Sequence, residues 1–246
     1  MGLQEGKMRI DRFLSDMGLA SRKEASLAAR RGAITVNGKT VKDSSTHIDP
    51  EQDEVCFMGR RVEYHRYVYV MLNKPDGYVS ATDDPRLPYV VELLPDELRK
   101  MELFPVGRLD RDTVGLMILT NNGALAHRVL SPRHHVEKKY YFKCESPLPS
   151  DAERLFSECI TLSDGYECKS ADLVADSDRL GGVITLTEGK YHQIKRMIAA
   201  IGNHLSYLER ISFAGIPLDP SLARGEWRFL SNDEKEHLES FQKAPN

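Results

Sequence analysis

The chain of 246 residues is poor in cysteine and contains no long apolar run. Its four cysteines form no C-x-x-C pair and show no zinc-like spacing, so neither a disulfide framework nor a zinc finger is expected. No apolar stretch approaches the roughly 20 residues that span a bilayer, and the N-terminal MGLQEGK lacks an apolar signal core. We therefore expect four free thiols and a cytoplasmic protein without a membrane partner.

Sequence signals for a cofactor or a metal are also missing. No glycine-rich loop leads from a predicted strand into a helix, as it does in cofactor-binding folds. The adjacent His134 and His135 have no matching Cys, His or carboxylate spacing. Asp110 and Asp112 are spaced D-x-D, but two arginines flank them, which makes a poor cation site. We expect neither a cofactor nor a metal.

The net charge of −3 conceals a basic region near the N-terminus. From Lys7 to Lys42, nine Lys and Arg residues stand against three Asp and Glu residues, and residues 43–54 then hold five acids and no base. A local surplus of this kind is typical of a surface that binds a polyanion.

The basic region is predicted to form two helices and a hairpin. Apolar residues recur at helical spacing from Ile10 to Met17. A second helix is predicted to begin at the S-x-x-E capping box of Ser21 and Glu24 and to end at Gly32. The pair Asn37-Gly38 lies between two short β-prone runs, which predicts a hairpin.

Basic side chains follow these elements with few acids among them. A solvated helix face is the ordinary explanation for such residues. Their spread over a helix, the next turn and a hairpin favours contact with an RNA or DNA backbone instead. The candidate RNA-binding residues are Arg9, Arg12, Arg22, Lys23, Arg30, Arg31 and Lys39. The arrangement resembles the small S4-like (αL) RNA-binding domain over residues 8–62, through segments 9–12, 20–25 and 36–38, and this suggests Met8 as the natural start.

The rest of the chain is predicted to be one larger domain. Residues 63–66 are polar and are interpreted as a linker, and residues 67–240 mix strand-like and helical segments without a repeat. The predicted fold class is α+β, with a mixed, mainly antiparallel sheet in this second domain. Strands are expected at residues 67–72, 103–106, 116–119, 137–144 and 183–186. An amphipathic helix is expected at residues 151–160, with Ala152, Leu155, Phe156 and Cys159 on its buried face.

A loop with the sequence GRLDRDTVGL, residues 107–116, separates two of the predicted strands. Strand ends inside a sheet are rigid, so the carboxylate of Asp110 is held in place, with Arg108 two residues upstream. The loop could carry only exposed ion pairs, which contribute at most about 1 kcal/mol. It could also hold an activated carboxylate beside an arginine that grips an anionic substrate, and the loop alone does not decide between the two.

Two further residues are weak candidates when each is taken alone. The helix after residue 193 has a buried stripe at positions 194, 197, 198 and 201 and is predicted to end at Gly202. Lys195 lies at the border of this stripe, so its ammonium can reach a cleft, whereas His192 is expected to face away. Tyr140 offers a ring and a hydroxyl on a predicted strand.

Taken together and in this order, four motifs resemble the RsuA branch of the RNA pseudouridine synthases. They are NKPDGYVSATDDP, GRLDRDTVGL, SPRHHVEKKY and EGKYHQIKRMIAAIGNH, and the similarity extends from residue 8 to about residue 238. One departure is Val114, where the family usually has Ser or Thr. Because that position is expected to pack the loop, the departure leaves the expected chemistry unchanged.

The resemblance implies isomerisation of a specific uridine to pseudouridine in ribosomal RNA, with the small subunit favoured over the large one. Asp110 would be the catalytic aspartate, either as a nucleophile or by stabilising a glycosidic intermediate. Tyr140 would stack on the extruded uracil and could take part in proton removal. Lys195 would pair with the aspartate and keep it ionised, and Arg108 would fill the space that the flipped base leaves. The partner would be ribosomal RNA or an assembly intermediate, and we expect a monomer. A methyltransferase and a non-catalytic ribosome-assembly protein are the competing hypotheses.

Overall fold

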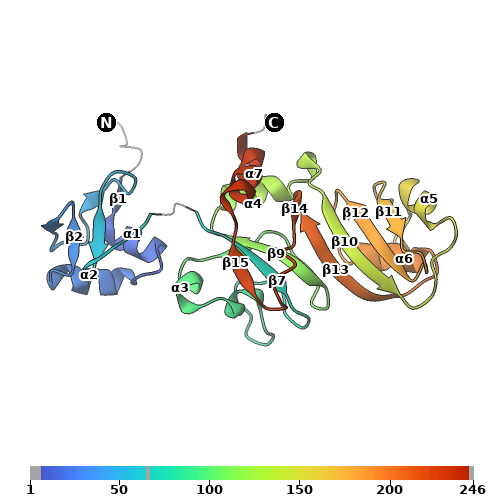
Figure 1. The fold of residues 1–246 in the computed structure, drawn as a ribbon, viewed down its shortest axis with the longest axis horizontal. Helices are drawn as coiled ribbons and strands as arrows, with labels where there is room; N and C mark the ends of the chain where they lie inside the picture. Colours follow the sequence, from blue (N-terminus) through green and yellow to red (C-terminus); the bar gives the residue numbers. More distant parts are fainter. Residues whose placement is uncertain (1–6, 65–66, 244–246) are drawn as a thin grey trace. The chain divides into compact units, whose positions relative to one another are not determined.

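The computed structural model of the chain describes residues 7–64 and 67–243 and divides them into two units (Figure 1). The first unit holds the described residues up to Val68 together with Leu94–Leu103, and the second holds Tyr69–Leu93 and the residues from Phe104 onward. The expectations about the N-terminal six residues and about positions 65–66 of the linker lie outside the described residues. The boundaries 8–62, 63–66 and 67–240 stay a prediction.

The N-terminal part of the first unit is built from short elements whose ends the local sequence fixes. Ser21 accepts a hydrogen bond from the Glu24 backbone, and Glu24 accepts one from the Ser21 backbone, so the predicted capping box is present. Asn37 and Gly38 both have positive φ at the turn of the predicted hairpin. The helices are α1 (Ile10–Asp16) and α2 (Arg22–Arg30), and the strands are β1 (Met8–Arg9), β2 (Ile34–Val36), β3 (Lys39–Thr40), β4 (His47–Ile48), β5 (Val55–Phe57) and β6 (Arg60–Arg61).

Two sheets and an apolar core hold these elements together. Strand β1 pairs with β4, and the order β3-β2-β5-β6 makes a four-stranded antiparallel sheet. Ile10, Phe13 and Leu14 of α1 are buried against alanines of α2 and against Ile34, so the apolar face of the first helix forms the centre of the core. The basic side chains are left on the outside.

The second unit is organised around one mixed sheet, which is mostly antiparallel as predicted (Figure 1). Its order is β11-β12-β10-β13-β9-β7-β15, with β14 on β13 and β8 on β9, and only the pair of β9 and β13 is parallel among those described. The strands are β7 (Tyr69–Lys74), β8 (Phe104–Pro105), β9 (Val114–Thr120), β10 (Lys138–Cys144), β11 (Asp172–Ala175), β12 (Gly181–Leu186), β13 (Leu205–Phe213), β14 (Ile216–Pro217) and β15 (Trp227–Phe229).

Strands β7 and β9 are buried along their whole length, which makes them the rigid centre of the sheet. Strand β9 is longer than the predicted 116–119, whereas β8 covers only Phe104–Pro105 of the predicted 103–106. Gly115 of β9 pairs with Arg210 of β13, and a Cβ at this glycine would lie 2.4 Å from the Arg210 carbonyl oxygen. The glycine is therefore required at the position where β9 pairs with β7 on one side and approaches β13 closely on the other.

Helices cover parts of this sheet, and one of them ends earlier than predicted. Helix α5 is Ala152–Ser157, so Cys159 lies beyond its end, exposed and with positive φ, and the prediction that it belongs to the buried face was wrong. Helix α5 packs on β11, and α6 (Gln193–Ala200) packs on β13. The other helices of this unit are α4 (Gly123–Leu130) and α7 (Asn232–Lys243), with 3-10 turns η1 (Val90–Leu93) and η2 (Pro132–His134), whereas α3 (Asp96–Arg99) belongs to the first unit.

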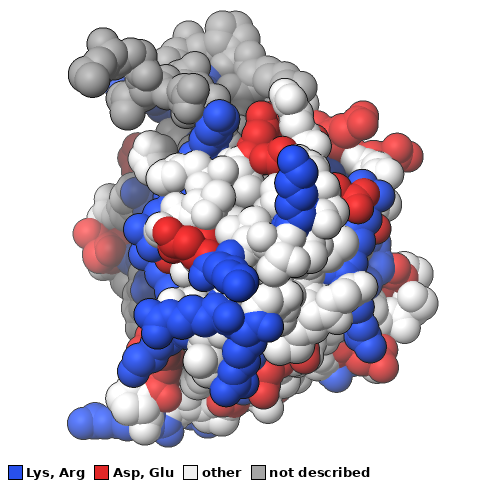
Figure 2. All heavy atoms as spheres, turned by 90° about the vertical axis from the view of Figure 1, so that its left-hand side faces the viewer, with Lys and Arg blue, Asp and Glu red and all other residues white. Residues whose placement is uncertain are grey.

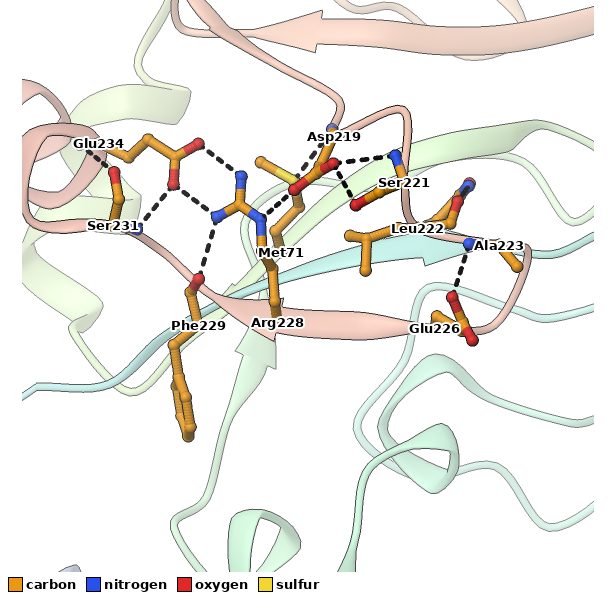
Figure 3. A network of polar contacts seen from close by, with 11 residues as sticks. Met71, Asp219, Ser221, Leu222, Ala223, Glu226, Arg228, Phe229, Ser231 and Glu234 are labelled. Carbon is orange, nitrogen blue, oxygen red and sulfur yellow. Dashed lines mark hydrogen bonds and ion pairs between the residues drawn. The ribbon is translucent and has the colours of Figure 1, made fainter.

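The C-terminal helix α7 is tied to the sheet by an arginine of β15 (Figure 3). The Arg228 guanidinium donates to Asp219 at 2.7 Å and to both oxygens of Glu234, at 2.7 and 2.8 Å. Glu234 also forms a capping box with Ser231 at the start of α7. This network fixes the start of α7 against β15.

Candidate functional site

The loop that carries Asp110 lies between β8 and β9 and is held by the segment that follows β7. The Ser80 hydroxyl donates to the Leu109 carbonyl at 2.8 Å and accepts from the Leu109 amide at 2.9 Å. The Gly77 amide donates to the Arg111 carbonyl at 3.1 Å. The backbone of the loop is therefore held by hydrogen bonds on both sides of Asp110, which the sequence motif did not reveal.

A fully buried lysine, Lys74, also holds this loop in place. The Lys74 ammonium donates to the carbonyls of Arg111 at 3.0 Å and Thr113 at 2.7 Å. Burial lowers the pKa of Lys74 to about 8, although nearby aspartates favour its charged form. Sequence analysis included this residue only within the motif NKPDGYVSATDDP, because nothing local shows that a lysine at a strand end is buried.

Asp110 lies partly buried between the side chains of Lys195 and His192. Its Oδ2 is 3.4 Å from the Lys195 ammonium, and its Oδ1 is 3.6 Å from Nε2 of His192. The prediction that His192 faces away was wrong, because this residue has φ +50 and precedes α6, so helical periodicity does not apply to it. The carboxylate thus has one basic group at each oxygen.

Lys195 contacts a second carboxylate more closely than it contacts Asp110. Its ammonium donates to Asp112 at 2.6 and 2.8 Å. Partial burial opposes the charge of Lys195, but the hydrogen bond to Asp112 and the charges of both aspartates raise its pKa above the usual value. Burial also opposes the charge of Asp112, yet the Lys195 ammonium lowers its pKa. Lys195 is therefore a firmly charged bridge between the two carboxylates.

Asp110 and Tyr140 line a hollow that has two parts. One part, which we call the inner lobe, is lined by Leu186, His192, Gln193, Ile194, Lys195 and Leu208 among others, so both apolar and polar side chains surround the carboxylate. The outer lobe is lined by Ser131, Lys138, Tyr166, Lys169, Tyr191 and Arg210 among others. Six residues line both lobes: Arg108, Asp110, Tyr140, Glu188, Gly189 and Lys190. The structure therefore brings all four candidate residues of this domain to one continuous hollow.

Glu188 is a buried carboxylate that shapes this hollow and that sequence analysis did not single out. Its Oε2 accepts from the Tyr166 hydroxyl at 2.9 Å, and its Oε1 accepts from the Lys169 amide at 2.9 Å and from the side chain of Gln193. Glu188 thereby braces the turn that leads to His192. Within residues 7–64 and 67–243, no three His, Cys, Asp or Glu side chains gather as a metal site would require.

The candidate RNA-binding residues of the first unit lie on its surface. Arg9 and Arg12 pair with acids of their own helix region, with Arg9 2.5 Å from Asp11 and Arg12 3.4 Å from Asp16. The other five have exposed side chains, and no carboxylate of the described part of the chain lies within 4.0 Å of them: Arg22, Lys23, Arg30, Arg31 and Lys39. Figure 2 shows Lys and Arg side chains gathered on the lower left of the face it presents. The five residues without a carboxylate nearby can therefore place their charges against a polyanion.

No helix of the described residues is long and apolar enough to cross a membrane. Residues 68–200 match the family model described as RNA pseudouridylate synthase, and residues 8–55 match the S4 domain model. Both matches fall where the sequence motifs suggested these two resemblances.

Similar proteins span almost the whole chain. It is 42% identical over 230 residues to the uncharacterized RNA pseudouridine synthase YtzG of Bacillus subtilis, covering 92% of this chain and 96% of that protein. It is 39% identical over 227 residues to the ribosomal small subunit pseudouridine synthase A of Escherichia coli, covering 92% and 98%. A crystal structure of a pseudouridylate synthase superposes with a TM-score of 0.66 at 36% identity and covers 94% and 99% of the two chains.

Proposed function

Because this chain belongs to the RNA pseudouridylate synthase family, we propose that it converts a specific uridine of small-subunit ribosomal RNA to pseudouridine, with Asp110 as the catalytic carboxylate. The position of Asp110 carries the proposal. It is the carboxylate of the shared hollow that lies between Lys195 and His192, and the Tyr140 ring lines the same space. The name of the Escherichia coli relative supports the small subunit as the substrate class.

The reaction breaks the bond between uracil N1 and ribose C1′, turns the base and joins C5 to C1′. The proton on C5 leaves and N1 gains one, so no group is added and no redox change occurs. Asp110 would act either as a nucleophile at the sugar or as the charge that stabilises a glycosidic intermediate. Tyr140 would stack on the uracil in the inner lobe, and Lys195 would hold the carboxylate ionised and in place.

Binding of the RNA would be shared between the two units. Arg108 is exposed at the mouth of both lobes, where it could take the place of the extruded base and offset the loss of stacking. The unpaired cations of the first unit would contact phosphates without reading the sequence. We propose that the enzyme is cytoplasmic, acts as a monomer of 27.9 kDa and needs no cofactor. Sedimentation near twice that mass would contradict the monomer.

Primer extension after carbodiimide treatment of ribosomal RNA tests the proposal. Wild-type protein, with chelator and without added cofactor, should produce one new stop in small-subunit RNA, while Asp110→Asn should produce none and bind RNA with nearly the wild-type affinity. A new stop in large-subunit RNA instead would move the substrate to that subunit. RNA binding without any stop in either would indicate an assembly protein without catalytic activity.

A further inference from the structure

The outer lobe contains one buried and one partly buried cation, and neither has a carboxylate partner within 4.0 Å among the described residues. Arg210 on β13 is only 2% exposed, and its guanidinium donates to the Leu116 carbonyl at 2.7 Å and lies over the Phe213 ring. Lys138 on β10 is partly buried, and its ammonium donates to the Val136 carbonyl at 2.8 Å. Within the described residues, no Asp or Glu oxygen comes within 4.0 Å of either charge.

Buried cations of this kind destabilise a fold unless another group offsets their loss of water. Burial lowers the pKa of Lys138 to about 8, and it also lowers the pKa of Arg210. The contact with the Leu116 carbonyl gives Arg210 a structural use in fixing β9. Lys138 has weaker contacts: its only hydrogen bond among the described residues is to a carbonyl two positions away, and its ammonium lies 5.9 Å from the centre of the Phe213 ring.

The other charges around the lobe increase the positive surplus. The two carboxylates that line it are already engaged: Glu188 accepts hydrogen bonds from Tyr166 and Lys169, and Asp110 lies between Lys195 and His192. Three exposed cations stand at its rim: Arg108, Lys169 and Lys190. A concave surface of one charge sign concentrates its field and attracts the opposite charge.

We propose that the outer lobe is a phosphate-binding subsite, in which Lys138 and Arg210 hold the RNA phosphate next to the target uridine. This inference rests on the proposed function, because the base would occupy the inner lobe. The two lobes meet at Asp110 and Tyr140, so a uracil on the inner side leaves its ribose at the boundary and the attached phosphate on the outer side. The phosphate would supply a negative charge at hydrogen-bond distance, which neither Lys138 nor Arg210 has from a carboxylate of the described residues.

Nucleotide binding tests the subsite without requiring turnover. Calorimetric titrations of the full chain would compare uridine, uridine 5′-monophosphate, uridine 3′-monophosphate and inorganic phosphate. At least one monophosphate should bind about tenfold more tightly than uridine, as expected for a charge-assisted hydrogen bond. Inorganic phosphate should bind more weakly than that monophosphate, because it has no base to place in the inner lobe.

Substitution of Lys138 distinguishes a specific phosphate contact from an effect of the protein's overall charge. Lys138→Gln should remove the preference for the monophosphate and leave uridine affinity unchanged, whereas Lys138→Arg should keep the preference. Lys139→Gln is the matched control, because the exposed Lys139 is the next residue on β10 and points to the other face of the sheet. It removes the same charge and should keep the preference.

Thermal melting shows whether Lys138→Gln still folds, so that a lost preference is not due to unfolding. Lys138→Gln removes a poorly compensated buried charge, so its melting temperature should equal or exceed that of the wild type.

Equal affinities for uridine and both monophosphates in the wild type would overturn the subsite, as would retention of the preference in Lys138→Gln. Binding of inorganic phosphate as tight as that of the nucleotide would mean a site for free phosphate and would overturn the assignment to RNA. If the wild-type protein binds a monophosphate more tightly than uridine but forms no pseudouridine, only the proposed function would be contradicted.

Discussion

The Lys195 ammonium lies 2.6 Å from Oδ1 of Asp112 and 3.4 Å from Oδ2 of Asp110, so one cation bridges two carboxylates of the same loop. The closer contact is to the more exposed carboxylate, with 66% of the Asp112 side chain exposed against 28% for Asp110. This arrangement fixes the cation at the wall of the hollow without neutralising Asp110 through a short hydrogen bond. It also makes the roles of the two aspartates separable by substitution.

Loss of the Lys195 charge should slow the reaction much more than it weakens RNA binding. Lys195→Met should reduce the single-turnover rate about 100-fold or more, which is the usual effect of removing one preorganised charge from an active site. Lys195→Arg should retain more of the rate because it keeps the charge. The rate is measured with saturating enzyme on ribosomal RNA, and a Met variant as fast as the wild type would exclude this role.

Asp112→Asn should have a smaller effect than Lys195→Met. Without the charge of Asp112, the ammonium keeps Asp110 as its nearest carboxylate partner. We expect a rate within about tenfold of the wild type, since a half-exposed ion pair contributes little by itself. A loss as large as that of Asp110→Asn, measured in the same assay, would assign Asp112 a part in the chemistry.

The buried Lys74 should make stability depend on pH in the alkaline range. The pKa of Lys74 is about 8 in the folded chain against an ordinary value of 10.5, so the unfolded chain holds this proton more firmly. The free energy of unfolding of the wild type, relative to Lys74→Met, should therefore rise as pH increases from about 8 to about 10.5. Urea unfolding over this range measures it. Lys143→Met is the control, because Lys143 is exposed, and a flat difference for both variants would contradict the prediction.

Gly115→Ala should be strongly destabilising. Its φ is +98, and the new Cβ would lie 2.4 Å from the Arg210 carbonyl oxygen and 2.9 Å from the Arg210 nitrogen, neither of which can move within the sheet. We expect a loss of more than about 2 kcal/mol in the free energy of unfolding. Gly123→Ala at the start of α4 has open space around it, so a change within about 1 kcal/mol is expected there. Similar effects of the two substitutions in chemical denaturation would refute this account.

Removing two exposed cations from the first unit should weaken RNA binding and make the affinity depend less steeply on salt concentration. The double variant Arg30→Gln and Arg31→Gln should lower the slope of log affinity against log salt concentration by up to about 2, because each phosphate contact accounts for about 0.7 to 0.9. Arg154→Gln is the control, since Arg154 already pairs with Asp151 at 2.8 Å and Glu158 at 2.5 Å. Filter binding at several salt concentrations gives the slopes. An unchanged slope in the double variant would remove these residues from the interface.

The sequence by itself determined the local structure and the candidate carboxylate. The capping box at Ser21, the turn at Asn37 and the helix end at Gly202 all follow from hydrogen bonds and φ preferences within a few residues. The motif around Asp110 also indicated the family, because its order and residue types are specific. These features need no information about distant parts of the chain.

Only the tertiary structure decided which side chains surround that carboxylate. The bond from Lys195 to Asp112 joins residues 83 positions apart, and the one from Arg210 to Leu116 joins residues 94 positions apart. The burial of Lys74 likewise depends on the strands on either side of it, and the contact of His192 depends on a left-handed backbone at one residue. Periodicity and spacing describe a residue's own element, whereas burial and charge pairing depend on which other elements pack against it.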